Sequence, residues 1–197
     1  MPSPTARTAL LLLAAFGLAS GARATTLTQM SLRDLARNAG RIFRGTVVAI
    51  DTGTVEAGGG ALPIVTYRLS VDEAFKGDFP PVKSGGPAVV EIRMVGTKDA
   101  AASGTPRRLP VLRDVPRLVK GQDYVLFTTE PSRIGLSTTV GLGQGAFVLV
   151  GGGKEQVAVN AFNNTGLARG LRAGLLPRGG PVPYGQLAQA IRAVLAE

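Results

Sequence analysis

The stretch that decides the fold runs from residue 41 to residue 77 and reads RIFRGTVVAIDTGTVEAGGGALPIVTYRLSVDEAFKG. It predicts a long strand over 41–51, a flexible glycine-rich turn over 53–60 and a second long strand over 62–74. In the second strand apolar side chains alternate with mostly polar ones, which is typical of a strand with one face buried. Gly45 lies inside the first strand and indicates a β-bulge or bend, which small barrels need at their corners. We therefore expect a bent hairpin that belongs to a barrel-like sheet.

Shorter strands are expected on the C-terminal side of this hairpin. Runs of β-branched and aromatic residues between turn residues predict strands over 88–95, 124–129, 146–150 and 156–160, and a weaker strand over 134–139. Three consecutive glycines at 151–153 separate two of these runs, which predicts a terminal hairpin.

A helix is expected on each side of the strands. Ser31 and Asp34 have the spacing of a capping box, so we expect a short helix over 32–39. A second, amphipathic helix is predicted over 186–195. Its apolar stripe consists of Leu187, Ile191 and Leu195.

Together these elements predict a mainly β fold. Five or six antiparallel strands with long hairpins suggest an OB-like closed or partly open antiparallel barrel, with a short N-terminal helix and a C-terminal helix. We expect the interior of this barrel to contain Tyr67, Leu69, Val90 and Leu126.

Residues 1–24 have the pattern of a secretory signal peptide. Arg7 precedes an apolar run over 9–19, and small residues ending in Ala-Arg-Ala follow it. The run is short for a membrane span, which needs about 20 apolar residues, although an uncleaved anchor is the alternative. We expect a secreted or periplasmic protein whose single domain covers 25–197, with no transmembrane segment after signal removal.

The composition excludes several kinds of catalytic site. The sequence has no cysteine and no histidine, which rules out a cysteine nucleophile, a Ser-His-Asp triad and zinc held by histidine or cysteine. Carboxylates remain, but Asp72 and Glu73 are neighbours on a predicted strand, so we expect them to point to opposite faces.

No cofactor is expected. The letters GLGQGA at 141–146 match a dinucleotide-binding fingerprint. That fingerprint must open a helix whose N-terminus holds the pyrophosphate. Here the next residues, 147–150, read as a strand, so we interpret the glycines as turn residues.

The chain is basic, with a formal net charge of +9. Outside the cytoplasm this charge favours an anionic envelope polymer as a partner. Nucleic acid is not expected as a partner, because three tyrosines, seven phenylalanines and no tryptophan leave few rings on which bases would stack.

Three segments resemble a known family. Residues 41–47 (RIFRGTV) are similar to the first strand of netrin-like domains and tissue inhibitors of metalloproteinases, and 65–77 (VTYRLSVDEAFKG) to their second strand with its Phe-Lys-Gly end. Residues 118–127 (LVKGQDYVLF) are similar to the later strand that follows a Gly-x-x-Tyr turn. The same pattern occurs in exported bacterial proteins of unknown function, which this chain resembles most. The resemblance implies an OB-like barrel.

The resemblance also implies one candidate function, protease inhibition. Inhibitors of that family chelate the zinc of the target protease through an N-terminal cysteine and its free amine. This chain has no cysteine, and the predicted mature start is Thr25, whose amine and hydroxyl are weaker ligands. Thr25 is therefore a candidate binding residue, with a secreted protein such as a protease as its partner.

Arginines of the long loop over 96–116 and just beyond it are the other candidates. Arg107, Arg108, Arg113 and Arg117 are interpreted either as an anion-binding patch or as a solvated loop. The function predicted first is a noncatalytic binding or accessory module outside the cytoplasm. The alternatives are a protease inhibitor and a carboxylate-dependent hydrolase.

Overall fold

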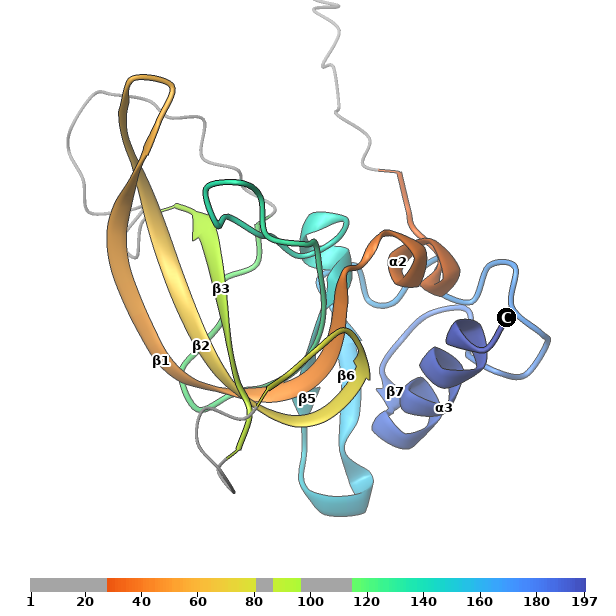
Figure 1. The fold of residues 1–197 in the computed structure, drawn as a ribbon. Helices are drawn as coiled ribbons and strands as arrows, with labels where there is room; N and C mark the ends of the chain where they lie inside the picture. Colours follow the sequence, from red (N-terminus) through yellow and green to blue (C-terminus); the bar gives the residue numbers. More distant parts are fainter. Residues whose placement is uncertain (1–27, 81–86, 97–114) are drawn as a thin grey trace, which may run out of the picture.

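The computed structural model describes residues 28–80, 87–96 and 115–197, and these residues form a mainly β fold (Figure 1). Within them, seven strands form one antiparallel sheet in the order β3-β2-β1-β4-β5-β6-β7. The strands are β1 (Arg41–Ala57), β2 (Gly60–Lys76), β3 (Val89–Val95), β4 (Asp123–Thr128), β5 (Ala146–Val150), β6 (Val157–Asn160) and β7 (Val182–Pro183). The other elements are the α-helices α2 (Leu32–Asn38) and α3 (Tyr184–Leu195) and the short 3₁₀ helices η1 (Leu142–Gly145) and η2 (Gly153–Glu155). The expected mainly β composition with two helices is confirmed.

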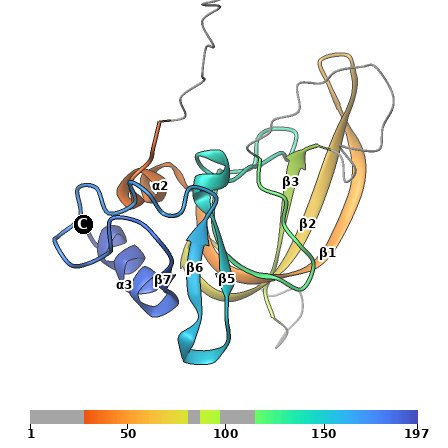
Figure 2. The ribbon, with the colours of Figure 1, turned by 180° about the vertical axis from the view of Figure 1, so that it is seen from behind.

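The hairpin of β1 and β2 is longer than predicted. The two strands pair as far as Ala57 and Gly60, so the expected turn over 53–60 is wrong. Only Gly58 and Gly59 lie between the strands, and their φ values of +60° and +80° suit a two-residue hairpin turn. The β-branched residues on both strands favour extended backbone up to these glycines. The hairpin projects as an arm on the side of the molecule away from the helices (Figure 1), and Figure 2 shows the same arrangement from behind.

Bulges bend this hairpin close to its base. The pairing of β1 with β2 shifts register near Ile42, Arg44 and Val47, and such shifts increase strand bending and twist. A Cβ atom at Gly45 would overlap the carbonyl oxygen of Ser70, so the two backbones approach more closely than a side chain allows. The predicted bulge at Gly45 is confirmed, and the sheet curves strongly around one face (Figure 1).

The curved sheet buries apolar side chains on both faces. Tyr124 and Leu126 of β4 join one group of buried residues, the inner cluster, whereas Val125 and Phe127 join the helix-side cluster. This division follows from the alternation of side chains along a strand. The four residues predicted for the interior all belong to the inner cluster and are at most 6 % exposed: Tyr67, Leu69, Val90 and Leu126.

Both helices cover the helix-side cluster. The predicted capping box is confirmed, since the Asp34 amide donates to Ser31 Oγ at 3.2 Å and the Ser31 amide donates to Asp34 Oδ2 at 3.0 Å. Helix α3 begins at Tyr184, two residues earlier than predicted, and Leu195 at its end remains 36 % exposed. The fully buried helix residues include Leu32, Leu35, Leu187 and Ile191.

Within the described residues, strand pairing does not close the sheet, because β3 and β7 are its edges. The predicted strand over 134–139 is wrong: local hydrogen bonds curl its first half into a turn, and one isolated bridge joins Thr139 to Thr128. From the same segment, the Ser137 amide donates a hydrogen bond to the carbonyl oxygen of Arg93 on β3 at 2.9 Å.

Several predictions lie outside the described residues. They concern the signal peptide over 1–24, the mature start at Thr25 and most of the loop over 96–116. Among the residues described, neither helix has the length and apolar character needed to cross a membrane.

Candidate functional site

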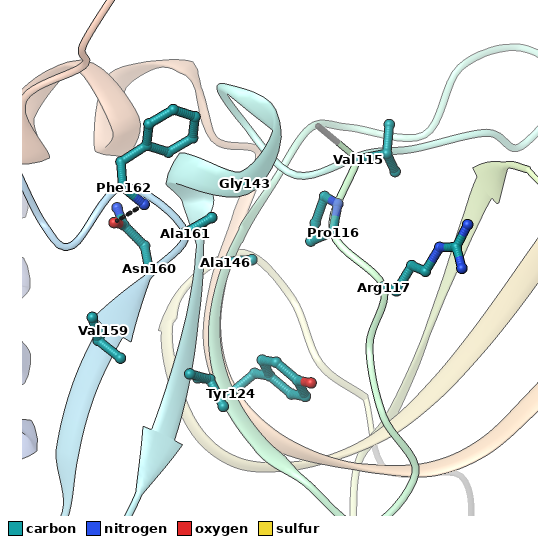
Figure 3. Close-up of a pocket in the computed structure, with 11 residues that line it drawn as sticks. Val115, Pro116, Arg117, Tyr124, Gly143, Ala146, Val159, Asn160, Ala161 and Phe162 are labelled. Carbon is teal, nitrogen blue, oxygen red and sulfur yellow. Dashed lines mark hydrogen bonds between the residues drawn. The ribbon is translucent and has the colours of Figure 1, made fainter. Parts of the chain in front are cut away.

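A cavity of about 520 Å³ opens between the segment 115–117 and the region of β5 and β6 (Figure 3). Most side chains that line it are apolar, and the polar ones are those of Arg117, Tyr124 and Asn160. We call this cavity the Arg117 pocket. Its apolar lining residues include Val115, Pro116, Ala146, Val159, Ala161 and Phe162.

The pairing of β4 with β5 forms the floor of the Arg117 pocket. Tyr124 pairs with Val148, and Leu126 pairs with Ala146. Tyr124 and Ala146 also belong to the inner cluster, so the pocket rests on the packed core. Because Ala146 carries only a methyl group, it leaves space above the sheet that a larger side chain would fill.

The segment 115–117 is held in place just beyond the pocket. Leu118 is 4 % exposed and packs in the inner cluster. The amide of Val119 donates a hydrogen bond to the Tyr124 hydroxyl at 3.1 Å. Burial raises the pKa of Tyr124, so this hydroxyl stays neutral at physiological pH. One tyrosine therefore serves both as pocket floor and as anchor for the pocket wall.

An asparagine pair shapes the opposite rim. Asn160 Oδ1 accepts the amides of Phe162 at 3.0 Å and Asn164 at 2.9 Å, and Asn160 Nδ2 donates to the Gln144 carbonyl at 2.9 Å. Asn164 Oδ1 accepts the Asn160 amide at 3.0 Å. Asn160 and Asn164 are buried, and such groups are stable inside a protein only when their hydrogen bonds are satisfied. The pair therefore fixes the turn that carries Ala161 and Phe162.

Arg117 supplies the only charge among the described residues that line the pocket. Its side chain is exposed, and its charge also reaches Tyr67, where burial raises the pKa and the guanidinium opposes that shift. In Figure 3 the Arg117 side chain points away from Tyr124 and Ala146, so its charge lies at the outer edge of the cavity. An apolar cavity with a guanidinium at its edge suits a ligand with an apolar body and an anionic group.

Of the predicted binding residues, only Arg117 lies within the described part of the chain. The others fall outside it: Thr25, Arg107, Arg108 and Arg113. The anion-binding patch therefore remains a prediction, and Arg117 is the member that can be placed beside a cavity.

A second polar group lies between β1, β2, β4 and α3. Arg44 Nε lies 4.0 Å from Asp72 Oδ2, and Arg44 Nη2 lies 3.4 Å from Asp123 Oδ2. The guanidinium carbon of Arg44 lies 4.6 Å from the centre of the Tyr184 ring. The Tyr184 hydroxyl donates a hydrogen bond to Glu73. The bulge beside Arg44 interrupts the strand alternation. Asp72 reaches this group through Arg44, whereas Glu73 reaches it through Tyr184. The two neighbouring acids therefore have different partners, and their expected separation to opposite faces stays a prediction.

These acids are held by cations and other donors. Glu73 accepts from both Tyr184 and Arg192, and Asp123 accepts from Thr46 at 2.6 Å. Within the described ranges, no three Asp or Glu residues are grouped as a metal site requires. Ion-paired carboxylates of this kind are typical of structural contacts between elements.

Sequence reasoning missed most of the Arg117 pocket. Its lining comes from segments up to 47 residues apart, such as Val115 and Phe162, and no local pattern marks them as neighbours. The nearest signal was Tyr124, a polar-tipped residue in an otherwise apolar strand.

Comparison with known proteins adds no family. No protein-family model matches the chain, and no curated protein matches it.

Proposed function

We propose that this protein is an exported, noncatalytic binding module with an OB-like barrel. The ligand site of this module is the Arg117 pocket. The ligand has an apolar part and an anionic group, and a secreted protein or an anionic envelope polymer presents it.

The strand order supports the OB-like barrel. An OB barrel has five strands, partly open, with the fifth strand between the third and the fourth. Here β3-β2-β1-β4 form a continuous row. Ser137 bonds to Arg93 of β3, and Thr139 of the same segment bridges to Thr128 of β4. A fifth strand at this place would close the barrel.

The resemblance to netrin-like domains agrees with the roles of the motif residues. Gly77 ends β2 with a φ of +96°, a conformation that favours glycine. The turn before Tyr124 pairs with β1, since the Gly121 amide donates to the Val47 carbonyl at 2.8 Å. These two glycines support the fold.

One observation carries the binding function: an apolar cavity of about 520 Å³ with one cation at its edge. Among the described residues that line it there is no carboxylate, serine or threonine. The hydroxyl of Tyr124 already accepts a hydrogen bond from the Val119 amide, so the lining offers a ligand mainly shape and charge. This composition favours binding over catalysis.

Titration with the fluorescent anion 8-anilinonaphthalene-1-sulfonate tests this site, because the probe combines apolar rings with a sulfonate. Ala161→Trp places a large ring at the exposed rim, and we expect affinity to fall about tenfold or more. Arg117→Gln removes the charge, and we expect a loss of about two- to fivefold that shrinks at high salt.

Two control variants test whether a loss of affinity is specific to the Arg117 pocket. Ala173→Trp and Arg172→Gln change exposed residues that do not line the pocket, and we expect wild-type affinity for both. Equal affinity of all four variants would contradict the proposed site. If the site holds, capture from the exported fraction with wild-type protein and with Ala161→Trp identifies which partner depends on it.

Export itself is tested separately. Mass measurement of the protein from the exported fraction should give a chain that begins at Thr25. A chain that retains residues 1–24 would contradict signal cleavage without affecting the pocket.

A further inference from the structure

A second hollow, of about 510 Å³, lies between α2 and the end of α3. It is lined by three cations and one acid, Arg33, Arg37, Lys76 and Glu197, together with short apolar side chains of the two helices. Arg33 and Arg37 are four residues apart on α2 and so share one face of the helix. We call this hollow the helix groove.

Lys76 keeps the end of α2 from repelling an anion. The last carbonyls of a helix carry partial negative charge. Lys76 Nζ donates to the carbonyl oxygens of Ala36 at 3.0 Å and Ala39 at 2.5 Å. The ammonium group therefore offsets this negative charge beside the groove.

Both arginines of the groove have donor groups without a hydrogen-bond partner among the described residues. Arg37 makes no ion pair or hydrogen bond with any residue that the structure describes. The Nε atom of Arg33 is buried and lacks a partner within the described residues. The acid on α2, Asp34, is turned to the helix N-terminus, where it accepts from Ser31. Arg37 contributes to lowering the pKa of Asp34, after the larger effect of the Ser31 hydrogen bonds, but no ion pair joins the two side chains among the described residues.

One carboxylate already occupies part of the groove. Glu197 Oε2 lies 2.5 Å from Arg33 Nη2, and both side chains are substantially exposed, by 54 % and 39 %. This contact shows that an oxyanion fits the arginine face. An exposed pair of this kind is weak, so an incoming anion can displace it.

We propose that the helix groove binds a ligand carrying several phosphate or carboxylate groups, and that Glu197 competes with this ligand for Arg33. Guanidinium groups bind both kinds of oxyanion through paired hydrogen bonds. The spread of three cations along the groove favours a multiply charged ligand over a single ion. This inference is independent of the function proposed for the Arg117 pocket.

Isothermal titration with tripolyphosphate and with citrate tests the groove, and the tighter of the two identifies the preferred oxyanion. We expect Arg37→Gln to weaken binding about tenfold, because a charged hydrogen-bond donor is lost. Arg37→Lys keeps the charge and should recover part of that loss. Glu197→Gln should strengthen binding about two- to fivefold, because it releases Arg33 from a competitor.

Arg178→Gln and Arg172→Gln are the controls, since each removes one positive charge from an exposed residue that lines neither the groove nor the Arg117 pocket. Thermal unfolding of each variant checks that α2 remains folded. The inference is overturned if neither anion binds, if the controls weaken binding as much as Arg37→Gln does, or if Glu197→Gln leaves the affinity unchanged.

Discussion

The Tyr184 hydroxyl donates a hydrogen bond to the Glu73 carboxylate, which links the first turn of α3 to the end of β2. Two turns later on α3, Arg192 binds the other carboxylate oxygen. The apolar stripe of α3 meanwhile packs in the helix-side cluster. Polar contacts to the hairpin and apolar contacts to the core therefore fix the helix together.

We expect Tyr184→Phe to lower the free energy of unfolding by about 1 to 2 kcal/mol, because a hydrogen bond to a charged group is lost. The phenyl ring keeps its packing, so the fold should be retained. Urea unfolding of the two proteins measures the difference. Arg172→Gln, which changes an exposed arginine outside this contact, should leave stability unchanged.

Alkaline pH should weaken the same contact. Burial and the bond to Glu73 raise the pKa of Tyr184 to about 12, from an ordinary value of 10.0. The folded state then binds its proton more tightly than the unfolded state, so the stabilisation is complete below pH 10 and is lost as pH rises towards 12. Urea unfolding from pH 9 to pH 11.5 should show a smaller decline in Tyr184→Phe than in wild type.

Other tyrosines contribute to that decline. Burial also raises the pKa values of Tyr67 and Tyr124. The free energy of unfolding of Tyr184→Phe should therefore still fall somewhat as pH rises. An unchanged slope in Tyr184→Phe would show that Tyr184 is not the group involved.

Gly45→Ala should be strongly destabilising. Its Cβ atom would overlap the Ser70 carbonyl oxygen, and relieving this overlap must move one strand of the hairpin. We expect a loss of about 2 to 3 kcal/mol in the free energy of unfolding. Gly60→Ala is the matched control, since nothing lies within 4 Å of its added Cβ atom. Equal stabilities of the two variants would contradict the close approach at Gly45.

Asn164→Gly should destabilise the rim of the Arg117 pocket, whereas Asn163→Gly should not. Both residues have a positive φ, of 56° and 51°, so glycine relieves the same backbone cost at each. Only Asn164 is buried and donates to the carbonyls of Ala158 at 2.9 Å and Gly180 at 2.8 Å. We expect a loss of about 2 to 4 kcal/mol for Asn164→Gly in chemical unfolding.

The elements that the sequence predicted well depend on local rules. Glycine's backbone freedom explains the bulge at Gly45. Short-range hydrogen bonds explain the capping box of Ser31 and Asp34. The alternation of side chains along a strand explains the burial of Leu69. The turn over 53–60 was predicted too long because glycine content, taken alone, does not show that pairing between strands carries extended backbone as far as Gly58.

The features that the sequence did not predict depend on tertiary contacts. Asp72 pairs with Arg44 of β1 and Glu73 with Arg192 of α3, and no local pattern marks these residues as neighbours. The Arg117 pocket joins segments up to 47 residues apart, and the helix groove joins α2 to the end of α3. Nothing local to Arg37 indicates that Lys76 lies beside the end of α2.

The most direct test of the Arg117 pocket is a map of backbone amide NMR shifts as decyl phosphate, an apolar chain with one anionic group, is added. We expect saturable shifts centred on residues 115–117, 146–148 and 159–162, which are strongly reduced in Ala161→Trp and unchanged in Ala173→Trp. Saturable shifts centred elsewhere, or a full response from Ala161→Trp, would contradict it.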